Sequence, residues 1–245
     1  MSNESFVSLL DGTRLWTMTS GSGRPIILLN GGPGMADYLE PFSSLLENDF
    51  TIHRFEQRGC GRSEARGPFT VGRFVEDIDE LRRHWGYEQW AVVGHSWGVD
   101  LGLAYALGHP HSVRALIGLS GGRIHNDRTW HEIYQQNRHK EPPPGSAANL
   151  ELNQLLNADW REFCKAPDLL ANLSRLSVPT LFLYGKNDIR PSWPTQQLSS
   201  LLPRATYREF SGADHYPWQA NPSGVREAIL SFLNTHLMSR SGNGD

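Results

Sequence analysis

Long hydrophobic runs, clustered charge and cysteine are all scarce in this chain of 245 residues. No stretch approaches the roughly 18 apolar residues of a membrane-spanning helix, so we expect no membrane span. The formal net charge is only -3 and no basic run is present, which argues against nucleic acid or an anionic membrane as partner. The N-terminal residues lack the charged-then-apolar pattern of a signal peptide, so we expect no secretion signal.

The two cysteines, Cys60 and Cys164, lack the spacing of a metal site. We therefore expect no bound metal and two free thiols in a reducing cytoplasm, with a disulfide as the alternative. The glycine-rich run Asn30–Gly34 lacks the lysine and serine or threonine that end a phosphate-binding loop. We expect no nucleotide or other cofactor, and a small molecule as substrate. The sequence leaves the oligomeric state open.

What the sequence does contain is a regular alternation of strand-like and helix-like runs. The first two predicted strands flank Asp11-Gly12 as a hairpin. The predicted strands are 6–10, 14–19, 25–29, 50–55, 89–93, 115–119, 179–184 and 206–210, and the predicted helices are 69–85, 99–107 and 225–237. Continuous apolar strands separated by helices indicate an α/β fold, with a mostly parallel central sheet and helices on both faces.

Residues 123–176 interrupt this alternation. The segment has no clear strand, is more polar than its surroundings and contains the run Pro142-Pro143-Pro144-Gly145. An insertion between two strands at the carboxyl edge of the sheet would lie above a site there. We therefore predict a core of residues 1–122 and 177–245 and a small cap or lid of residues 123–176. A surface excursion without substrate contact is the alternative.

The most informative motif is Gly94-His95-Ser96-Trp97-Gly98. It lies between a predicted buried strand and a predicted helix, which is the context of a nucleophile elbow. In that turn the strand folds back on the helix so closely that side chains in place of the glycines would clash. The motif predicts Ser96 as a nucleophile. The alternative is a chance glycine-serine turn.

A serine nucleophile needs a general base, which in this topology is a histidine after the last strand. Only His215 and His236 meet that condition. His215 lies in a loop directly after the predicted strand 206–210, whereas His236 falls within the closing helix and is interpreted as a surface residue. His95, beside the serine, is interpreted as a packing or hydrogen-bonding residue.

The base needs an acid that orients its ring and stabilises its positive charge. Asp188 lies in the turn after the predicted strand 179–184, so it reaches the same edge of the sheet. Asp214 is a rival, although adjacent side chains rarely point at one another in that geometry. Asp100, within the helix that follows the serine, is a second rival.

Backbone amides must stabilise the negative charge that develops on the substrate oxygen. In this topology one amide belongs to the residue after the nucleophile, here Trp97. The other comes from the loop after the predicted strand 25–29, where we favour the Gly32 amide. The alternative for that loop is a simple turn.

Five motifs, in this order, resemble those of the α/β-hydrolase fold and, within it, of the proline iminopeptidase branch. They are Asn30–Gly34, Gln57–Ser63, Ser96–Gly98, Gly185–Asp188 and Gly212–His215. The resemblance covers roughly residues 6–122 and 177–237. It implies Ser96 as nucleophile, Asp188 as acid, His215 as base and the Gly32 and Trp97 amides as oxyanion hole.

This chain differs from that branch in two motifs and in the cap. Asn30 stands where the branch usually has histidine, and Glu56 stands where it has aspartate. The cap of the branch is longer than residues 123–176 of this chain and carries glutamates that bind the free amine of a peptide. Four carboxylates in residues 123–176 are candidates for that role, and none matches by position: Glu132, Glu151, Asp159 and Glu162.

We therefore hypothesise a serine hydrolase that cleaves a small ester, lactone or amide through an acyl-enzyme on Ser96. Trp97, Trp130 and Trp160 are candidate apolar walls for the substrate, with a place in the core as the alternative. A proline iminopeptidase-like aminopeptidase and a non-catalytic ligand-binding member of the fold are the alternative functions. An epoxide hydrolase or haloalkane dehalogenase would need aspartate at position 96.

Overall fold

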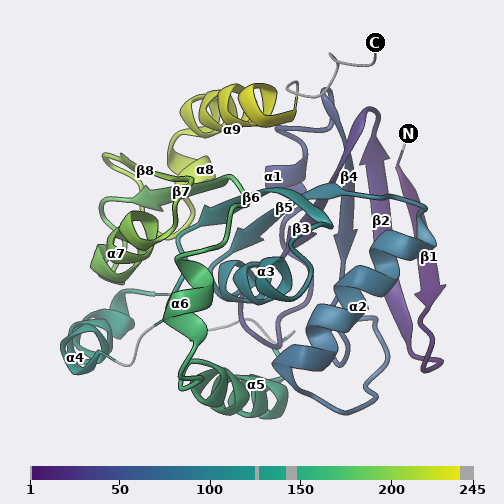
Figure 1. Cartoon of the computed structure of the whole chain (residues 1–245), viewed down its shortest axis with the longest axis horizontal. Helices are drawn as coiled ribbons and strands as arrows, with labels where there is room; N and C mark the ends of the chain where they lie inside the picture. Colours follow the sequence, from purple (N-terminus) through teal and green to yellow (C-terminus); the bar gives the residue numbers. More distant parts are fainter. Residues whose placement is uncertain (1, 125–126, 142–147, 238–245) are drawn as a thin grey trace.

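A single eight-stranded sheet forms the centre of the computed structural model, which describes residues 2–124, 127–141 and 148–237 (Figure 1). The strands are β1 (Asn3–Ser8), β2 (Arg14–Gly21), β3 (Arg24–Leu29), β4 (Phe50–Phe55), β5 (Trp90–His95), β6 (Val113–Leu119), β7 (Thr180–Gly185) and β8 (Ala205–Phe210). Their order across the sheet is β1-β2-β4-β3-β5-β6-β7-β8. Only β1–β2 and β2–β4 pair antiparallel, and all other neighbours pair parallel. The predicted α/β class with a mostly parallel sheet is confirmed.

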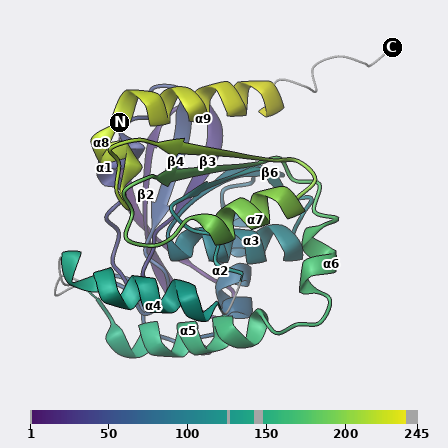
Figure 2. The same ribbon diagram turned by 90° about the vertical axis from the view of Figure 1, so that its left-hand side faces the viewer.

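Helices cover both faces of the sheet. They are α1 (Glu40–Ser43), α2 (Val71–His84), α3 (Trp97–Gly108), α4 (Arg128–Asn137), the 3-10 turn η1 (Arg138–Lys140), α5 (Leu150–Phe163), α6 (Leu169–Leu173), α7 (Trp193–Leu201), α8 (Pro217–Ala220) and α9 (Pro222–Leu237). Figures 1 and 2 show α1, α8 and α9 on one face and α2, α3 and α7 on the other. In the described ranges, no helix is long and apolar enough to cross a membrane.

The continuous apolar strands are explained by burial on both faces. In β3, Ile27 and Leu29 join the core on the side of α2 and α3, whereas Ile26 and Leu28 join the core beneath α9. Successive side chains of a strand point to opposite faces, so a strand between two helical layers needs apolar residues at every position.

The first strand differs from the prediction, because it spans Asn3–Ser8 and not residues 6–10. The chain already turns at Leu9, whose amide bonds to the Thr13 carbonyl at 2.9 Å while its carbonyl accepts from the Gly12 amide at 2.9 Å. Leu10 is left 84% exposed at the hairpin tip. The apolar run 6–10 suggested a strand, but the turn chemistry of Asp11-Gly12 extends further back than expected.

The described part of residues 123–176 contains α4, η1, α5 and α6 and no strand. Helix α5 packs against α2, and Leu152, Leu156 and Trp160 belong to the same core cluster as α2 and α3. Figure 2 shows α4 and α5 beyond α2 and α3, on the side opposite α9. The α5 part is thus packed on the core and not separate from it, while the division into core and cap stays a prediction.

Candidate active site

Ser96 occupies a sharp turn between β5 and α3. Its backbone has φ 55 and ψ -121, a conformation that costs energy for a residue with a side chain and that marks functional turns. A Cβ on Gly98 would lie 2.0 Å from the Leu29 carbonyl oxygen, and one on Gly94 would lie 2.3 Å from the Gly98 carbonyl oxygen. The two glycines of the motif are therefore required by backbone contacts. The Ser96 amide donates to the Leu119 carbonyl at 2.8 Å, which fixes the turn to β6.

His215 and Asp188 are brought together from separate strand ends. His215 Nδ1 lies 2.7 Å from Asp188 Oδ2. Asp188 Oδ1 also accepts from the Arg190 amide at 3.0 Å and lies 3.4 Å from Arg190 Nη1. Burial of the carboxyl favours its neutral form, but His215 and Arg190 outweigh that effect and lower the pKa of Asp188. Asp188 is therefore ionised, so His215 Nδ1 is the donor and Nε2 is left as the basic nitrogen.

Main-chain contacts hold the two loops that carry this pair. The Asn187 amide donates to the Ala213 carbonyl at 2.8 Å, and the Lys186 amide donates to the Phe210 carbonyl at 3.0 Å. A Cβ on Gly185 would lie 1.8 Å from the Asp214 carbonyl oxygen, so the end of β7 requires glycine there. The positions of acid and base relative to one another follow from the strand order β7–β8.

His95 connects the serine turn to the base. Its ring centroid lies 4.7 Å from that of His215, and it directly precedes Ser96 in the chain. Within the described residues, no hydrogen bond joins the Ser96 hydroxyl to the His215 ring. Such bonds commonly tighten only when substrate is bound.

The rival acids and the rival histidine have other partners. Asp214 is exposed and accepts from the Tyr216 amide at 3.0 Å within its own loop. Asp100 is fully buried and accepts from the Gly122 and Arg123 amides at 3.1 Å and 2.7 Å. On α9, His236 Nδ1 lies 3.5 Å from Nη2 of Arg204. The structure places neither aspartate against the His215 ring.

The glycine loop after β3 lies directly against Ser96. A Cβ on Gly31 would be 2.9 Å from the Ser96 Cβ. The Gly31 amide already donates to the Tyr38 hydroxyl at 2.7 Å, whereas Gly32 is exposed. The Trp97 amide belongs to the first turn of α3, where amides have no acceptor within the helix. This leaves the Gly32 and Trp97 amides as the candidate donors to a substrate oxygen.

The motif 57–63 supports that glycine loop and the sheet. Gln57 Nε2 donates to the Asn30 carbonyl at 3.3 Å, and Asn30 Nδ2 donates to the Met35 carbonyl at 2.8 Å, which curls the loop. Arg58 is fully buried and pairs with Asp77 at 2.6 Å. These residues therefore stabilise the loop and the strands that carry the candidate active site.

A family model described as alpha/beta hydrolase fold matches residues 24–142. The proline iminopeptidase of Heyndrickxia coagulans is 25% identical over 88% of this chain and 92% of its own length. That of Saccharolobus solfataricus is 37% identical, but over only 41% of this chain and 34% of its own length. The chain has the α/β-hydrolase fold. Within that fold it resembles the proline iminopeptidase branch.

Solved α/β-hydrolase structures share the fold over nearly the whole chain. An E-2-(acetamidomethylene)succinate hydrolase superposes with a TM-score of 0.79, at 19% identity, over 96% of this chain and 100% of that one. The esterase EaEST from Exiguobacterium antarcticum superposes with a TM-score of 0.72, at 20% identity, over 95% of this chain and 100% of that one. At these identities the likeness concerns the fold alone.

The three tryptophans expected as apolar walls are all buried. The Trp97 indole packs edge-on to Phe74 with ring centroids 6.2 Å apart. Trp160 stacks on Phe163 and donates from Nε1 to the Arg123 carbonyl at 3.0 Å, and Trp130 Nε1 donates to the Pro191 carbonyl at 2.9 Å. Their contacts are those of interior side chains, and a role as substrate walls stays a prediction.

The four carboxylates considered for amine binding are exposed or have other partners. Glu132 and Glu151 are exposed, and Glu162 pairs with Lys165 at 2.7 Å. Asp159 accepts from the Val71 amide at 2.6 Å and so caps α2.

The sequence did not point to Glu141, the carboxylate that is linked to Asp188 through Arg190. Glu141, after η1, accepts from Arg190 Nη2 at 2.8 Å, and the same guanidinium lies over the Tyr134 ring at 4.8 Å. Arg190 therefore links Asp188 to the segment that follows α4. Only its position two residues after Asp188 could have singled out Arg190, and nothing local singled out Glu141.

No group of three metal-ligating side chains occurs in the described part of the chain. Cys60 and Cys164 are free thiols, and burial raises the pKa of each to about 12.

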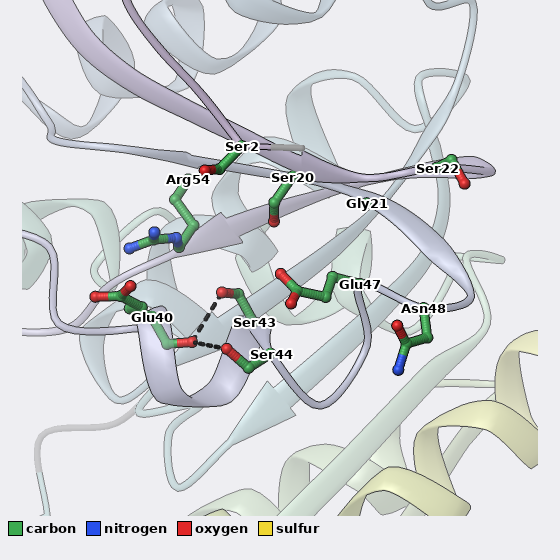
Figure 3. A pocket seen from close by; sticks show the side chains of 10 residues that line it. All are labelled: Ser2, Ser20, Gly21, Ser22, Glu40, Ser43, Ser44, Glu47, Asn48 and Arg54. Atoms are coloured by element: carbon green, nitrogen blue, oxygen red, sulfur yellow. Dashed lines mark hydrogen bonds between the residues drawn. The ribbon is translucent and has the colours of Figure 1, made fainter.

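A cavity of about 540 Å³ lies between the end of β2, helix α1 and β4, lined mainly by hydroxyls and carboxylates (Figure 3). Ser96, Asp188 and His215 are not among its lining residues. This cavity is therefore separate from the candidate active site.

Proposed function

We propose that this α/β-hydrolase is a serine hydrolase that cleaves a small ester, lactone or amide through an acyl-enzyme on Ser96. The observation that carries the proposal is the 2.7 Å hydrogen bond between His215 and Asp188 at the sheet edge where Ser96 occupies its strained turn. Nucleophile, acid and base follow one another in the chain order expected for this topology.

In the proposed reaction, Ser96 Oγ attacks the substrate carbonyl carbon as its proton passes to His215 Nε2. The Gly32 and Trp97 amides donate to the oxyanion, and Asp188 stabilises the imidazolium. His215 then gives the proton to the leaving group, which departs as alcohol or amine. Water then attacks the acyl-enzyme as it loses a proton to His215. His215 returns that proton to Ser96 Oγ as the acyl–oxygen bond breaks, and the acid product leaves.

The carboxylates of the cap region favour an ester or lactone over a peptide with a free amine. A buried ammonium group needs a carboxylate that is not already paired. Glu141 is the carboxylate that approaches the triad, and Arg190 already compensates its charge.

The test begins with a fluorophosphonate probe on the folded protein. Labelling of wild type at Ser96, and none of Ser96→Ala at unchanged thermal stability, supports the proposal. Hydrolysis by Ser96→Ala at the wild-type rate, on any substrate that wild type hydrolyses, would refute the nucleophile. A wild type that stays unlabelled and inactive on acyl esters, lactones and arylamides would favour a ligand-binding protein.

An aminopeptidase of the proline iminopeptidase kind is the second candidate, favoured by the likeness to the Heyndrickxia coagulans enzyme over nearly the full length. The two candidates differ in their preference between prolyl arylamide and a short acyl ester with the same leaving group. We expect the larger kcat/KM for the ester. A clear preference for the free-amine arylamide over both the ester and its N-acetylated form would establish the aminopeptidase instead.

A further inference from the structure

A chain of hydrogen bonds joins the glycine loop after β3 to the loop that carries His215. The Gly31 amide donates to the Tyr38 hydroxyl at 2.7 Å, and that hydroxyl lies 2.5 Å from His95 Nδ1. On the other side of the ring, His95 Nε2 lies 2.9 Å from the main-chain carbonyl oxygen of His215. The acyl-transfer steps do not use Tyr38 or His95, yet these two side chains connect the two loops on which the steps depend.

The direction of every bond in this chain is determined by its two ends. A carbonyl oxygen can only accept, so His95 Nε2 carries the hydrogen and donates to His215. An amide can only donate, so the Tyr38 oxygen accepts from Gly31. The Tyr38 hydroxyl hydrogen is then free to donate to His95 Nδ1, the acceptor nitrogen of a neutral ring. All three bonds are satisfied by one arrangement of hydrogens.

The surroundings keep both side chains in the required protonation state. His95 is almost completely buried, and this burial, together with the neighbouring His215, holds the pKa of His95 well below its usual value. Burial also raises the pKa of the Tyr38 hydroxyl. A neutral imidazole and a protonated phenol are what the directed chain needs.

We propose that Tyr38 and His95 are positioning residues that hold the oxyanion loop and the base in register with each other. This inference rests on the proposed serine hydrolase function. Gly32 has φ 130, a conformation that favours glycine, and the Gly31–Tyr38 bond fixes the start of the segment that presents the Gly32 amide. The His95–His215 bond fixes the main chain from which the basic imidazole projects.

An aromatic cluster encloses this chain and provides a matched control. Tyr38 packs edge-on to both His95 and Tyr216, with ring centroids 5.6 Å and 6.2 Å apart. Trp218 packs edge-on to His95 at 4.8 Å. Tyr38→Phe removes the shared hydroxyl and keeps the ring, whereas Tyr216→Phe removes a hydroxyl from the same cluster without touching the three bonds.

The test measures kcat and KM per active site, with sites counted by the endpoint of fluorophosphonate labelling. For Tyr38→Phe we expect kcat to fall about 10²-fold, comparable to the loss of one oxyanion-hole donor, with KM within about twofold of wild type. Affinity for an arylboronic acid, which mimics the tetrahedral intermediate, should fall in parallel with kcat/KM. Tyr216→Phe should stay within about threefold of wild type in kcat.

A merely structural role would lower the thermal midpoint or the fraction of labelled sites and leave kcat per site and boronate affinity unchanged. That outcome, or a kcat within threefold of wild type for Tyr38→Phe, overturns the proposal. If Tyr38→Phe does not fold, His95→Gln answers the same question, because it breaks the contact with Tyr38, and an unchanged kcat per site again overturns the proposal. Failure of wild type to be labelled at Ser96 refutes the proposed function and is read separately from these ratios.

Discussion

The loops at the ends of β7 and β8 and the segment of α4 and η1 both approach the candidate active site, but different interactions hold them. The strand-end loops are tied by main-chain bonds, such as Asn187 to Ala213 at 2.8 Å. The α4 segment is tied by side chains, such as Trp130 Nε1 to the Pro191 carbonyl at 2.9 Å and Arg190 to Glu141. Main-chain bonds do not depend on which side chains are present, whereas side-chain contacts do.

Substitutions in the two regions should therefore differ in the size of their effects. Changes of side chains that main-chain contacts hold in the candidate active site, or of the glycines that permit those contacts, should greatly lower kcat or the free energy of unfolding. Changes in the side-chain contacts of α4 should modify catalysis without disturbing the sheet. The following experiments test that separation, beginning with the largest expected effect.

The candidate acid Asp188 gives the sharpest contrast, because a second aspartate, Asp214, lies in the adjoining loop. Asp188→Asn should lower kcat about 10⁴-fold, since an amide holds the His215 ring in the wrong tautomer and cannot stabilise its charge. Asp214→Asn, which changes an exposed residue, should leave kcat within about threefold. Steady-state kinetics on the same ester decides, and a reversed order would assign the acid to Asp214.

Two glycines at the second position of a helix test whether the elbow is fixed by main-chain contacts. A Cβ on Gly98 would lie 2.0 Å from the Leu29 carbonyl oxygen, whereas one on Gly72 would have no neighbour within 4 Å. Gly98→Ala should destabilise the protein by about 3 kcal/mol, and Gly72→Ala should stabilise it by about 0.5 to 1 kcal/mol. Denaturant titration measures both, and equal effects would contradict the distinction.

Acid sensitivity should arise in the sheet and not in the α4 segment. Burial lowers the pKa of His53 from 6.5 to about 4, so the unfolded chain takes up the proton first as the pH falls. Stability is therefore present above pH 6.5 and lost as the pH falls toward 4, by about 2 kcal/mol between pH 7 and pH 5.

His53→Gln should remove this part of the pH dependence. His95 also lowers the free energy of unfolding as the pH falls, and it does so in wild type and in His53→Gln alike. The difference between the two curves of unfolding free energy against pH therefore gives the contribution of His53. Parallel curves for wild type and variant would show that His53 is protonated equally in the folded and unfolded chains.

The smallest effect is expected at the contact between the α4 segment and the triad. Glu141→Gln removes the charge that pairs with Arg190, which frees the guanidinium to compete with His215 for Asp188. We expect kcat/KM to fall roughly threefold to tenfold, with unchanged thermal stability. Glu132→Gln, an exposed change in the same segment, is the control, and an equal effect of the two would show that Arg190 is held without Glu141.

Local sequence patterns were sufficient to predict the parts of the molecule whose conformation depends on few contacts. The strand–turn–helix context of Ser96 predicted the elbow, because the backbone approach there permits only glycine at 94 and 98. The first hairpin was misjudged by a few residues, because the apolar run 6–10 and the turn at Leu9 compete in the same stretch. The carboxylates proposed for amine binding illustrate the opposite case, since burial and pairing of a side chain are not encoded in its own neighbourhood.

The sequence by itself determined the α/β class, the succession of strands along the chain and the loops that carry Ser96, Asp188 and His215. It did so because apolar periodicity, glycine spacing and chain order act over short distances or through topology. Only the tertiary structure decided that Tyr38 and His95 join the glycine loop after β3 to the loop that carries His215, and that Glu141 reaches Asp188 through Arg190. The residues of these contacts are 57, 120 and 49 positions apart in the chain, and only the packing of the sheet brings them together.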